Sequence, residues 1–176
     1  MEKVPSYLEI MIPPEEIREH VKKLAQRISK DYKDKNLLLV GILKGSFIFM
    51  ADLVRELDLD DIEIDFMKVT SYGEGTESSR EPKIEADMSI NPQGRHVLIV
   101  EDIVDTGYSF KSLLEILKAR HPASLKTCTL LSKSERREVE VPIDYLGMSI
   151  ENRWVEGYGL DTNERGRQYP FVGARK

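Results

Sequence analysis

Residues 97–109 decide the fold, and they read Val-Leu-Ile-Val-Glu-Asp-Ile-Val-Asp-Thr-Gly-Tyr-Ser. The run from Val97 to Val100 consists of β-branched and aliphatic side chains, which is typical of a strand buried on both faces of a sheet. Two adjacent acids, Glu101 and Asp102, follow it directly. Carboxylates at the end of a buried strand are costly to desolvate unless they stay in water, bind a cation or accept hydrogen bonds. The pattern therefore predicts a strand with an acidic end.

A short polar turn at residues 105–109 comes next and leads into a predicted helix, whose apolar residues recur at helical spacing: Phe110, Leu113, Leu114 and Leu117. Gly107 lets the backbone approach a ligand without a Cβ, and the consecutive N–H groups of the turn could surround an anion at the helix N-terminus. Thr106 and Ser109 add hydroxyl donors. A phosphate group is the ligand that best suits this turn, and the acids beside it could bind sugar hydroxyls or Mg²⁺. These residues alone indicate a sugar-phosphate site.

Composition limits the classes of protein that the chain can belong to. Its 176 residues, 40% of them hydrophobic, suffice for one core and are short for two, so residues 1–176 are expected to form a single domain. The 26 basic and 31 acidic residues give a net charge of -5, which argues against binding to nucleic acid through an overall basic field. The single cysteine, Cys128, provides neither a disulfide framework nor a cysteine-based metal site. No stretch is apolar for long enough to span a bilayer or to act as a signal peptide. We expect a cytoplasmic protein with no membrane or nucleic-acid partner.

Strand-like and helix-like segments alternate along the chain. Helices are expected at residues 13–30, 47–57 and 110–120, and strands at residues 37–43, 62–70, 84–88, 125–131 and 143–148. This alternation predicts an α/β fold with a mainly parallel central sheet flanked by helices. The strand at 37–43 runs into Lys44-Gly45-Ser46 before a helix, so it should end at the same sheet edge as the opening stretch, where such folds bind ligands. Residues 71–80 are small and polar and are expected to form a mobile loop.

The opening stretch as a whole resembles the phosphoribosyl-pyrophosphate signature of the type I phosphoribosyltransferases. Further segments resemble the members of that family that act on 6-oxopurines, in the same order: Leu43-Lys44-Gly45-Ser46, Ser71-Tyr72, Lys133, Trp154-Val155 and Gly157-Tyr158-Gly159-Leu160-Asp161. The resemblance implies the type I phosphoribosyltransferase fold, with a small hood formed by the chain ends. It also implies Mg²⁺-dependent transfer of the 5-phosphoribosyl group from phosphoribosyl pyrophosphate to N9 of hypoxanthine or guanine, which gives IMP or GMP and pyrophosphate. A homodimer or homotetramer is expected.

The resemblance assigns the phosphoribosyl group to the opening stretch. Its expected contacts are Glu101, Asp102, Ile103, Val104, Asp105, Thr106, Gly107, Tyr108 and Ser109. Within this set, Glu101 and Asp102 would meet the ribose hydroxyls and a first Mg²⁺, and residues 105–109 would cradle the 5′-phosphate. Asp105 would also act as the general base near purine N7.

The remaining roles implied by the resemblance lie outside the opening stretch. Pyrophosphate would be bound by Lys44, Gly45 and Arg167, and the purine by Lys133, Trp154, Val155 and Asp161. Trp154 would stack on the ring, Lys133 would donate to the 6-oxo group, and Asp161 would lie beside a second Mg²⁺. A lysine donor favours 6-oxopurines over adenine. The loop at Ser71 and Tyr72 would close as a lid and exclude water.

The chain departs from the family pattern in the hood. Thr162, Arg165 and Gly166 stand where aromatic residues are usual, and Trp154 replaces a more familiar Phe. If this loop packs differently as a result, Arg167 would be displaced and Arg165 could compete for pyrophosphate.

Each assignment also has an ordinary structural explanation. The acids at 101 and 102 could end a strand in water, Trp154 could fill the core, and Lys133 could be a solvated lysine. Two other functions compete with the enzyme. A signalling receiver domain also begins with an acidic pair, but here too little chain follows the pair for such a domain. A regulator with the same fold that binds RNA or DNA would need a basic face, for which the chain offers Arg136-Arg137 and its arginine-rich tail.

Overall fold

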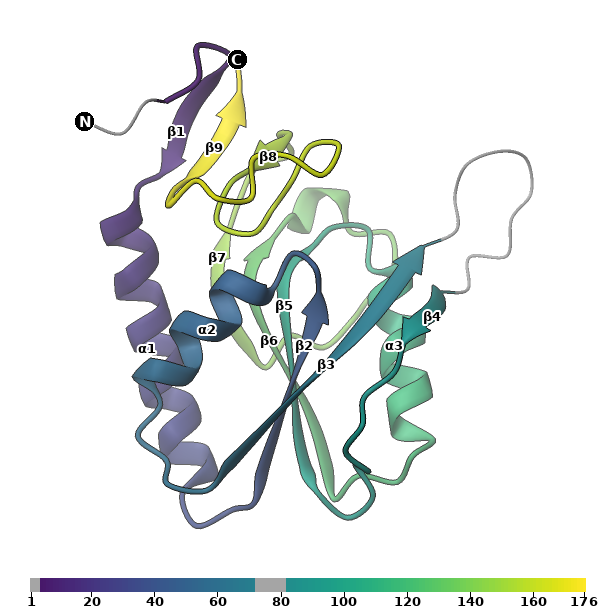
Figure 1. The fold of residues 1–176 in the computed structure, drawn as a ribbon. Helices are drawn as coiled ribbons and strands as arrows, with labels where there is room; N and C mark the ends of the chain where they lie inside the picture. The colour runs from purple at the N-terminus through teal and green to yellow at the C-terminus, as the bar shows by residue number, and fades with distance from the viewer. Residues whose placement is uncertain (1–3, 72–81) are drawn as a thin grey trace.

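The central sheet has six strands in the order β4-β3-β2-β5-β6-β7 (Figure 1). The computed structural model describes residues 4–71 and 82–176. Its strands are β1 (Leu8–Ile12), β2 (Leu37–Leu43), β3 (Ile62–Ser71), β4 (Pro82–Ala86), β5 (His96–Val104), β6 (Ser124–Ser132), β7 (Tyr145–Ser149), β8 (Val155–Glu156) and β9 (Val172–Arg175). The helices are α1 (Pro14–Tyr32), α2 (Phe47–Glu56) and α3 (Tyr108–Lys118), with a 3₁₀ turn, η1, at Ser134–Arg136. All neighbours in the central sheet run parallel except β3 and β4. The predicted α/β fold is confirmed.

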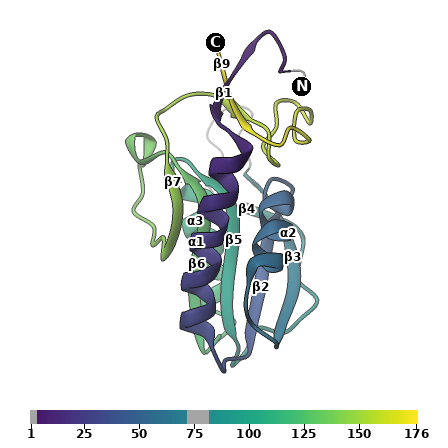
Figure 2. The same cartoon turned by 90° about the vertical axis from the view of Figure 1, so that its left-hand side faces the viewer.

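Helices cover both faces of this sheet, and the strands at its centre alternate between two cores. Leu37, Leu39, Leu98 and Val100 pack with residues of α1 and α2, whereas Leu38, Val40, Val97 and Ile99 pack with residues of α3. Figure 2 shows α1 and α2 together on one face. Successive side chains of a strand point to opposite faces, so only an unbroken apolar run can fill both cores. This burial explains the sequence of β2 and the first half of β5.

A second, three-stranded sheet forms a hood at the carboxyl end of the parallel strands (Figure 1). Its order is β1-β9-β8, and both of its pairings are antiparallel. Leu8 of β1 pairs with Arg175 of β9, so the two ends of the chain meet here. The expectation of a hood formed by the chain ends is confirmed. The hood places residues 154–167 opposite the sheet edge where β2 and β5 end.

Several predicted boundaries differ from the structure. The strand expected at 84–88 is β4, Pro82–Ala86, because residues 82–86 pair with the end of β3. β5 continues to Val104, since Ile103 and Val104 pair with Leu131 and Ser132 of β6. Glu101 and Asp102 therefore lie inside the strand and not at its end, so that prediction was wrong. The predicted mobile loop falls almost wholly on residues 72–81, which lie outside the described residues. None of the described helices is long and apolar enough to cross a membrane.

Candidate active site

The turn after β5 is held in shape by its glycine. Gly107 has a φ of 97° and precedes the first residue of α3, Tyr108. A Cβ at this position would lie 2.5 Å from the carbonyl oxygen of Val139, and a side chain rarely adopts this backbone conformation. Gly107 is thus required both by conformation and by the close approach of the chain at Val139.

The carbonyl groups of the turn are bound from behind by residues 133–139. The backbone N–H of Lys133 donates to the Val104 oxygen at 3.0 Å, and those of Glu138 and Val139 donate to the Thr106 oxygen. The guanidinium of Arg137 donates to the carbonyl oxygens of Val104 and Asp105 and to Ser132 Oγ. In a trans peptide the N–H points away from the carbonyl. The N–H groups of Asp105, Thr106 and Gly107 are therefore turned towards the opposite side, where α3 begins and directs the N–H groups of its first turn.

A cavity of about 320 Å³ lies on that side of the turn. Its lining includes most of the residues predicted to bind the phosphoribosyl group, namely Glu101, Ile103, Val104, Asp105, Thr106, Gly107 and Ser109. Gly45, predicted to bind pyrophosphate, lines the same cavity. Two residues of the predicted phosphoribosyl set, Asp102 and Tyr108, are not among its lining. The structure thus brings Gly45 to the predicted phosphoribosyl residues, whereas Lys44 and Arg167 are not among the lining of this cavity.

The acidic pair lies beside this cavity in an environment that disfavours charge. Burial raises the pKa of Glu101 well above its usual range, and the neighbouring carboxylate of Asp102 raises it further. Burial also raises the pKa of Asp102, which is 8% exposed and accepts the Ile103 N–H at 2.8 Å. Adjacent carboxylates that lose much of their hydration favour a bound cation. In the described part of the chain, however, no three His, Cys, Asp or Glu side chains are grouped closely enough to hold a metal by themselves.

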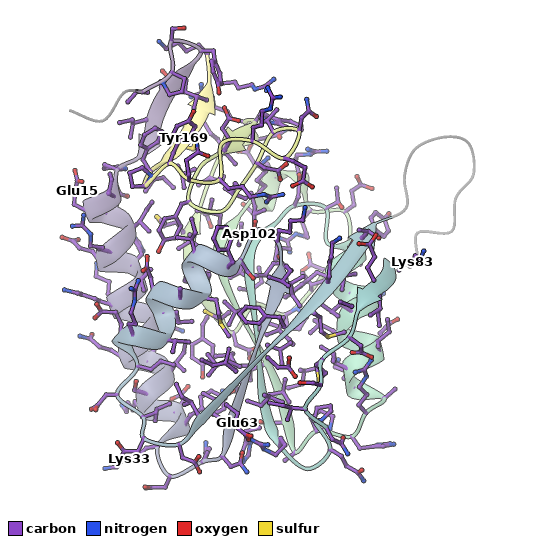
Figure 3. The ribbon with its side chains drawn as sticks, viewed as in Figure 1. Glu15, Lys33, Glu63, Lys83, Asp102 and Tyr169 are labelled. Carbon is purple, nitrogen blue, oxygen red and sulfur yellow. The ribbon has the colours of Figure 1, made fainter. Side chains whose placement is uncertain are left out.

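Gly45 lies between the acidic pair and the hood. A Cβ on Gly45 would fall 1.7 Å from Asp102 Oδ2, so a side chain at this position would force that buried carboxylate to move. On the other side, a Cβ on Gly159 of the hood would fall 2.0 Å from the Gly45 carbonyl oxygen. Gly159 itself has a φ of 100°. Figure 3 shows Asp102 where the sheet meets the hood. These two close approaches, one to the Asp102 carboxylate and one to the Gly45 backbone, fix the spacing between the two parts of the site.

The cations predicted to bind pyrophosphate are joined by a carboxylate that the sequence pattern did not single out. Glu164 contacts Lys44 Nζ at 3.0 Å through Oε1 and Arg167 Nη2 at 3.0 Å through Oε2. Arg167 also contacts Asp161 Oδ1 at 2.9 Å and donates to the Gly159 carbonyl oxygen at 2.8 Å. Arg167 is therefore held beside Lys44, whereas Arg165 lines a separate cavity with Tyr7 and Glu156. The only signal for Glu164 in the sequence was its spacing of three residues from both Asp161 and Arg167.

The predicted general base meets two basic side chains. Asp105 Oδ2 lies 3.8 Å from Lys133 Nζ and 3.1 Å from Arg136 Nη1. Its other oxygen, Oδ1, is buried and has no hydrogen-bond donor among the described residues. The Lys133 side chain is 7% exposed, and this burial lowers the pKa of its amine while the charge of Asp105 opposes the shift. Asp105 thus lines the cavity with the buried Lys133 amine as its neighbour, and Arg136 and Arg137 both contact the turn that contains Asp105.

The remaining predicted residues lie on the hood and on β3. Trp154 is 58% exposed, so the alternative that it fills the core is excluded. Val155 is buried in β8 and pairs with Ala174 of β9. Ser71 is the last residue of β3, and Tyr72 lies outside the described residues. The predicted lid is therefore not placed.

Comparison with known proteins agrees with this arrangement. The family model described as "phosphoribosyl transferase domain" matches residues 13–163. The chain is 46% identical over 168 residues to hypoxanthine phosphoribosyltransferase of Escherichia coli K12, covering 94% of both chains. It is 47% identical over 171 residues to hypoxanthine-guanine phosphoribosyltransferase of Dictyostelium discoideum, covering 96% of this chain and 95% of that protein. The crystal structure of a hypoxanthine phosphoribosyltransferase from Staphylococcus aureus superposes with a TM-score of 0.91 at 42% identity, covering 96% and 91% of the two chains.

Proposed function

The chain belongs to the phosphoribosyltransferase family, and from this premise we propose that it is a purine-salvage enzyme acting on hypoxanthine and guanine. It transfers the 5-phosphoribosyl group from phosphoribosyl pyrophosphate to purine N9 and releases pyrophosphate. The C1′–O bond to pyrophosphate breaks, the C1′–N9 bond forms, and the purine loses a proton. The observation that carries this proposal is the turn at 105–109, whose N–H groups face a cavity shared with the acidic pair and Gly45.

The 5′-phosphate binds at the turn and the ribose beside it. Backbone N–H groups and the hydroxyls of Thr106 and Ser109 supply the donors, as at other helix N-termini that bind phosphate. Glu101 and Asp102 accept hydrogen bonds from the ribose hydroxyls. Because Gly45 lines the same cavity, the pyrophosphate leaves towards the loop at Lys44 and Arg167.

The donor set near the cavity fits Mg²⁺. Glu101 and Asp102 would hold the ion together with substrate oxygens and water, since Mg²⁺ in proteins commonly uses one or two carboxylates plus phosphates. Asp161 would hold a second ion at the hood, where its carboxylate now contacts Arg167. When bound, Mg²⁺ stabilises the negative charge that develops on the leaving pyrophosphate. The raised pKa values of the acidic pair support this assignment, because a cation favours the doubly ionised state that burial opposes.

Asp105 and Lys133 read one edge of the purine. N7 and the 6-oxo group are neighbours on that edge, and Asp105 Oδ2 and Lys133 Nζ are neighbours in the site. Asp105 takes the proton from N7 as N9 is alkylated, and the Lys133 amine donates to the 6-oxo group. Adenine presents a 6-amino group there, so a buried donor would face another donor. Trp154 stacks on the ring, and the Val155 backbone contacts its edge.

We also propose a cytoplasmic location and a homodimer or homotetramer. The single cysteine is fully buried, which suits a reducing compartment. Ile64 and Phe66 lie on one face of β3 and are 42% and 37% exposed, which supports a contact with a second copy. The competing role as a regulator of RNA or DNA finds less support, because Arg136 and Arg137 bind Asp105 and the carbonyls of the turn.

A substrate panel tests the enzyme directly. Purified protein with MgCl₂ and phosphoribosyl pyrophosphate is incubated with hypoxanthine, guanine, xanthine or adenine, and nucleotides are separated by chromatography. We expect IMP and GMP to form, and AMP to form little or not at all. If none of the four purines is converted to a nucleotide, the proposed function is overturned.

A further inference from the structure

Trp154 is held in place although it is exposed. At 58% exposure it is the most exposed of the large hydrophobic side chains in the described residues. Its indole N–H nevertheless donates to Thr162 Oγ1 at 2.6 Å, and the Arg175 guanidinium lies 5.6 Å from its ring centroid. An exposed aromatic side chain without such contacts would be free to change rotamer. The two contacts restrain the indole while leaving much of its surface open.

Thr162 belongs to a closed turn that fixes the position of its hydroxyl. Its backbone N–H donates to the Arg165 oxygen at 2.9 Å, and the Arg165 N–H donates back to the Thr162 oxygen at 3.1 Å. The two residues between them, Asn163 and Glu164, have φ values of 51° and 64°, as in a tight hairpin turn. A β-branched side chain on such a turn has few rotamers. The acceptor for the indole N–H is therefore preorganised.

The hydrogen bond between Trp154 and Thr162 depends on the indole N–H. A phenylalanine at position 154 would have no N–H and would need no acceptor at 162. A tryptophan at the same position has an N–H that acts only as a donor, so an acceptor such as the Thr162 hydroxyl sets the orientation of the ring. Trp154 and Thr162 thus form a pair linked by one hydrogen bond.

We propose that Thr162 is a positioning residue for the purine: its hydroxyl fixes the plane of the Trp154 indole, on which the base stacks. This inference rests on the proposed function, because it takes Trp154 as the platform for the base. Fixing the ring before binding removes the entropy loss that a free rotamer would suffer on stacking. Thr162 acts through Trp154, because its hydroxyl accepts the indole N–H. Loss of the Thr162 hydroxyl should therefore weaken the binding of the purine and leave the binding of phosphoribosyl pyrophosphate unchanged.

The test uses Thr162→Val, which keeps the β-branched shape and removes the acceptor, and Thr162→Ser, which keeps the hydroxyl. From the usual strength of a neutral hydrogen bond, Thr162→Val should raise KM for hypoxanthine about 3- to 10-fold with KM for phosphoribosyl pyrophosphate unchanged. Thr162→Ser should stay close to the wild type. In a Trp154→Phe background, the same Thr162→Val change should have no further effect, because the N–H is gone.

Fluorescence gives a second readout, because Trp154 is the only tryptophan in the chain. Thr162→Val should shift the emission maximum of the free protein and weaken quenching by IMP, whereas Thr162→Ser should do neither. Two results would overturn the proposed role of Thr162. One is a wild-type KM for hypoxanthine in Thr162→Val. The other is that Thr162→Val raises this KM by the same factor in the Trp154→Phe background as in the wild type. Failure of the wild-type protein to form nucleotide is a different result, since it would overturn the proposed function itself.

Discussion

The two halves of the site differ in whether the groups that would bind a charged ligand already have partners within the protein. In the core half, which comprises Gly45 and residues 101–109, the turn at 105–109 presents backbone N–H donors to the cavity beside Glu101, and the carbonyls of that turn are bound elsewhere. In the hood half, which comprises Lys44 and residues 154–167, the two cations are already bound to carboxylates. Glu164 joins Lys44 to Arg167, and Asp161 contacts Arg167 as well. The donors of the core half face the cavity and can bind a phosphate there, whereas the cations of the hood half must first release their carboxylate partners before they bind pyrophosphate.

This difference indicates where substitutions will be tolerated. Backbone donors and close glycine contacts cannot be replaced by a neighbouring side chain, so changes in the core half should be severe. Exposed ion pairs are individually weak, because solvent screens them. Changes to the hood half should therefore shift affinities by small factors. The following predictions are ordered from the largest expected effect on activity to the smallest.

Asp105→Asn should lower kcat by a factor on the order of 10² or more, as loss of a general base does, while substrate binding is retained. The measurement is steady-state formation of IMP, with binding of phosphoribosyl pyrophosphate followed separately by calorimetry. Asp65→Asn serves as a matched control, because Asp65 lies on β3 and binds backbone groups. Unchanged kcat in Asp105→Asn would remove this residue from proton transfer.

Gly45→Ala should lower kcat/KM for phosphoribosyl pyrophosphate by at least about 10-fold, because a misplaced site residue loses that much or more. The new Cβ would meet Asp102 Oδ2, and that buried carboxylate would have to move. Gly94→Ala is the control, since Gly94 has a φ of 72° and a Cβ added there would meet no atom within 4 Å, so only backbone strain is introduced. Near wild-type kinetics in Gly45→Ala would show that Asp102 need not hold its position.

Glu164→Gln should tighten pyrophosphate binding by about 2- to 5-fold, since exposed ion pairs are worth a fraction of a kcal/mol to about 1 kcal/mol. Lys44 and Arg167 would then no longer be bound by the Glu164 carboxylate. Calorimetric titration with pyrophosphate and Mg²⁺ measures the change, and the gain should shrink in high salt. Glu115→Gln, which removes the same charge from the exposed face of α3, controls for net charge. Weaker binding in Glu164→Gln would mean that Glu164 supports this subsite and does not compete with pyrophosphate.

Asp65→Asn should leave kcat unchanged and destabilise the fold by about 1 kcal/mol at neutral pH, the usual value of a lost hydrogen bond. Partial burial alone would raise the pKa of Asp65, but N–H groups of Ile90, Phe66 and Ser89 and the Ser89 hydroxyl hold it below its ordinary value. A depressed pKa gives stability that is present above the unfolded pKa of about 3.9 and is lost as pH falls through the folded value. Urea unfolding should show the wild-type advantage at neutral pH and a smaller one below about pH 4. A constant difference across this range would contradict the role of the charge.

Much of the fold could be predicted because its central strands are buried on both faces. The runs in β2 and β5 had to be continuously apolar, and their alternation with amphipathic helices fixed the class of fold. The hood strands β1 and β9 are short, and their partners lie at the far end of the chain, as with Leu8 and Arg175. Local periodicity carries no information about such a pairing.

The part of the candidate site that is formed by backbone groups could be predicted from sequence, and the part that depends on side-chain contacts could be predicted less well. The turn at 105–109 has a local signature in Gly107 and its hydroxyl neighbours. The guanidinium of Arg137 supports the carbonyl of Val104, and the carboxylate of Glu164 binds Lys44, in both cases across a long stretch of chain. These roles depend on tertiary contacts, so composition and spacing could show only that the two residues were charged.

The most direct test of the division between the two halves is a crystal structure of the protein with GMP. The 5′-phosphate should lie against the backbone N–H groups of residues 105–109, the ribose hydroxyls against Glu101 and Asp102, and the base against Trp154 with its 6-oxo group at Lys133. Lys44 and Glu164 should remain in contact, because GMP carries no pyrophosphate. A phosphate bound instead at Lys44 and Arg167, with the turn at 105–109 unfilled, would contradict this account.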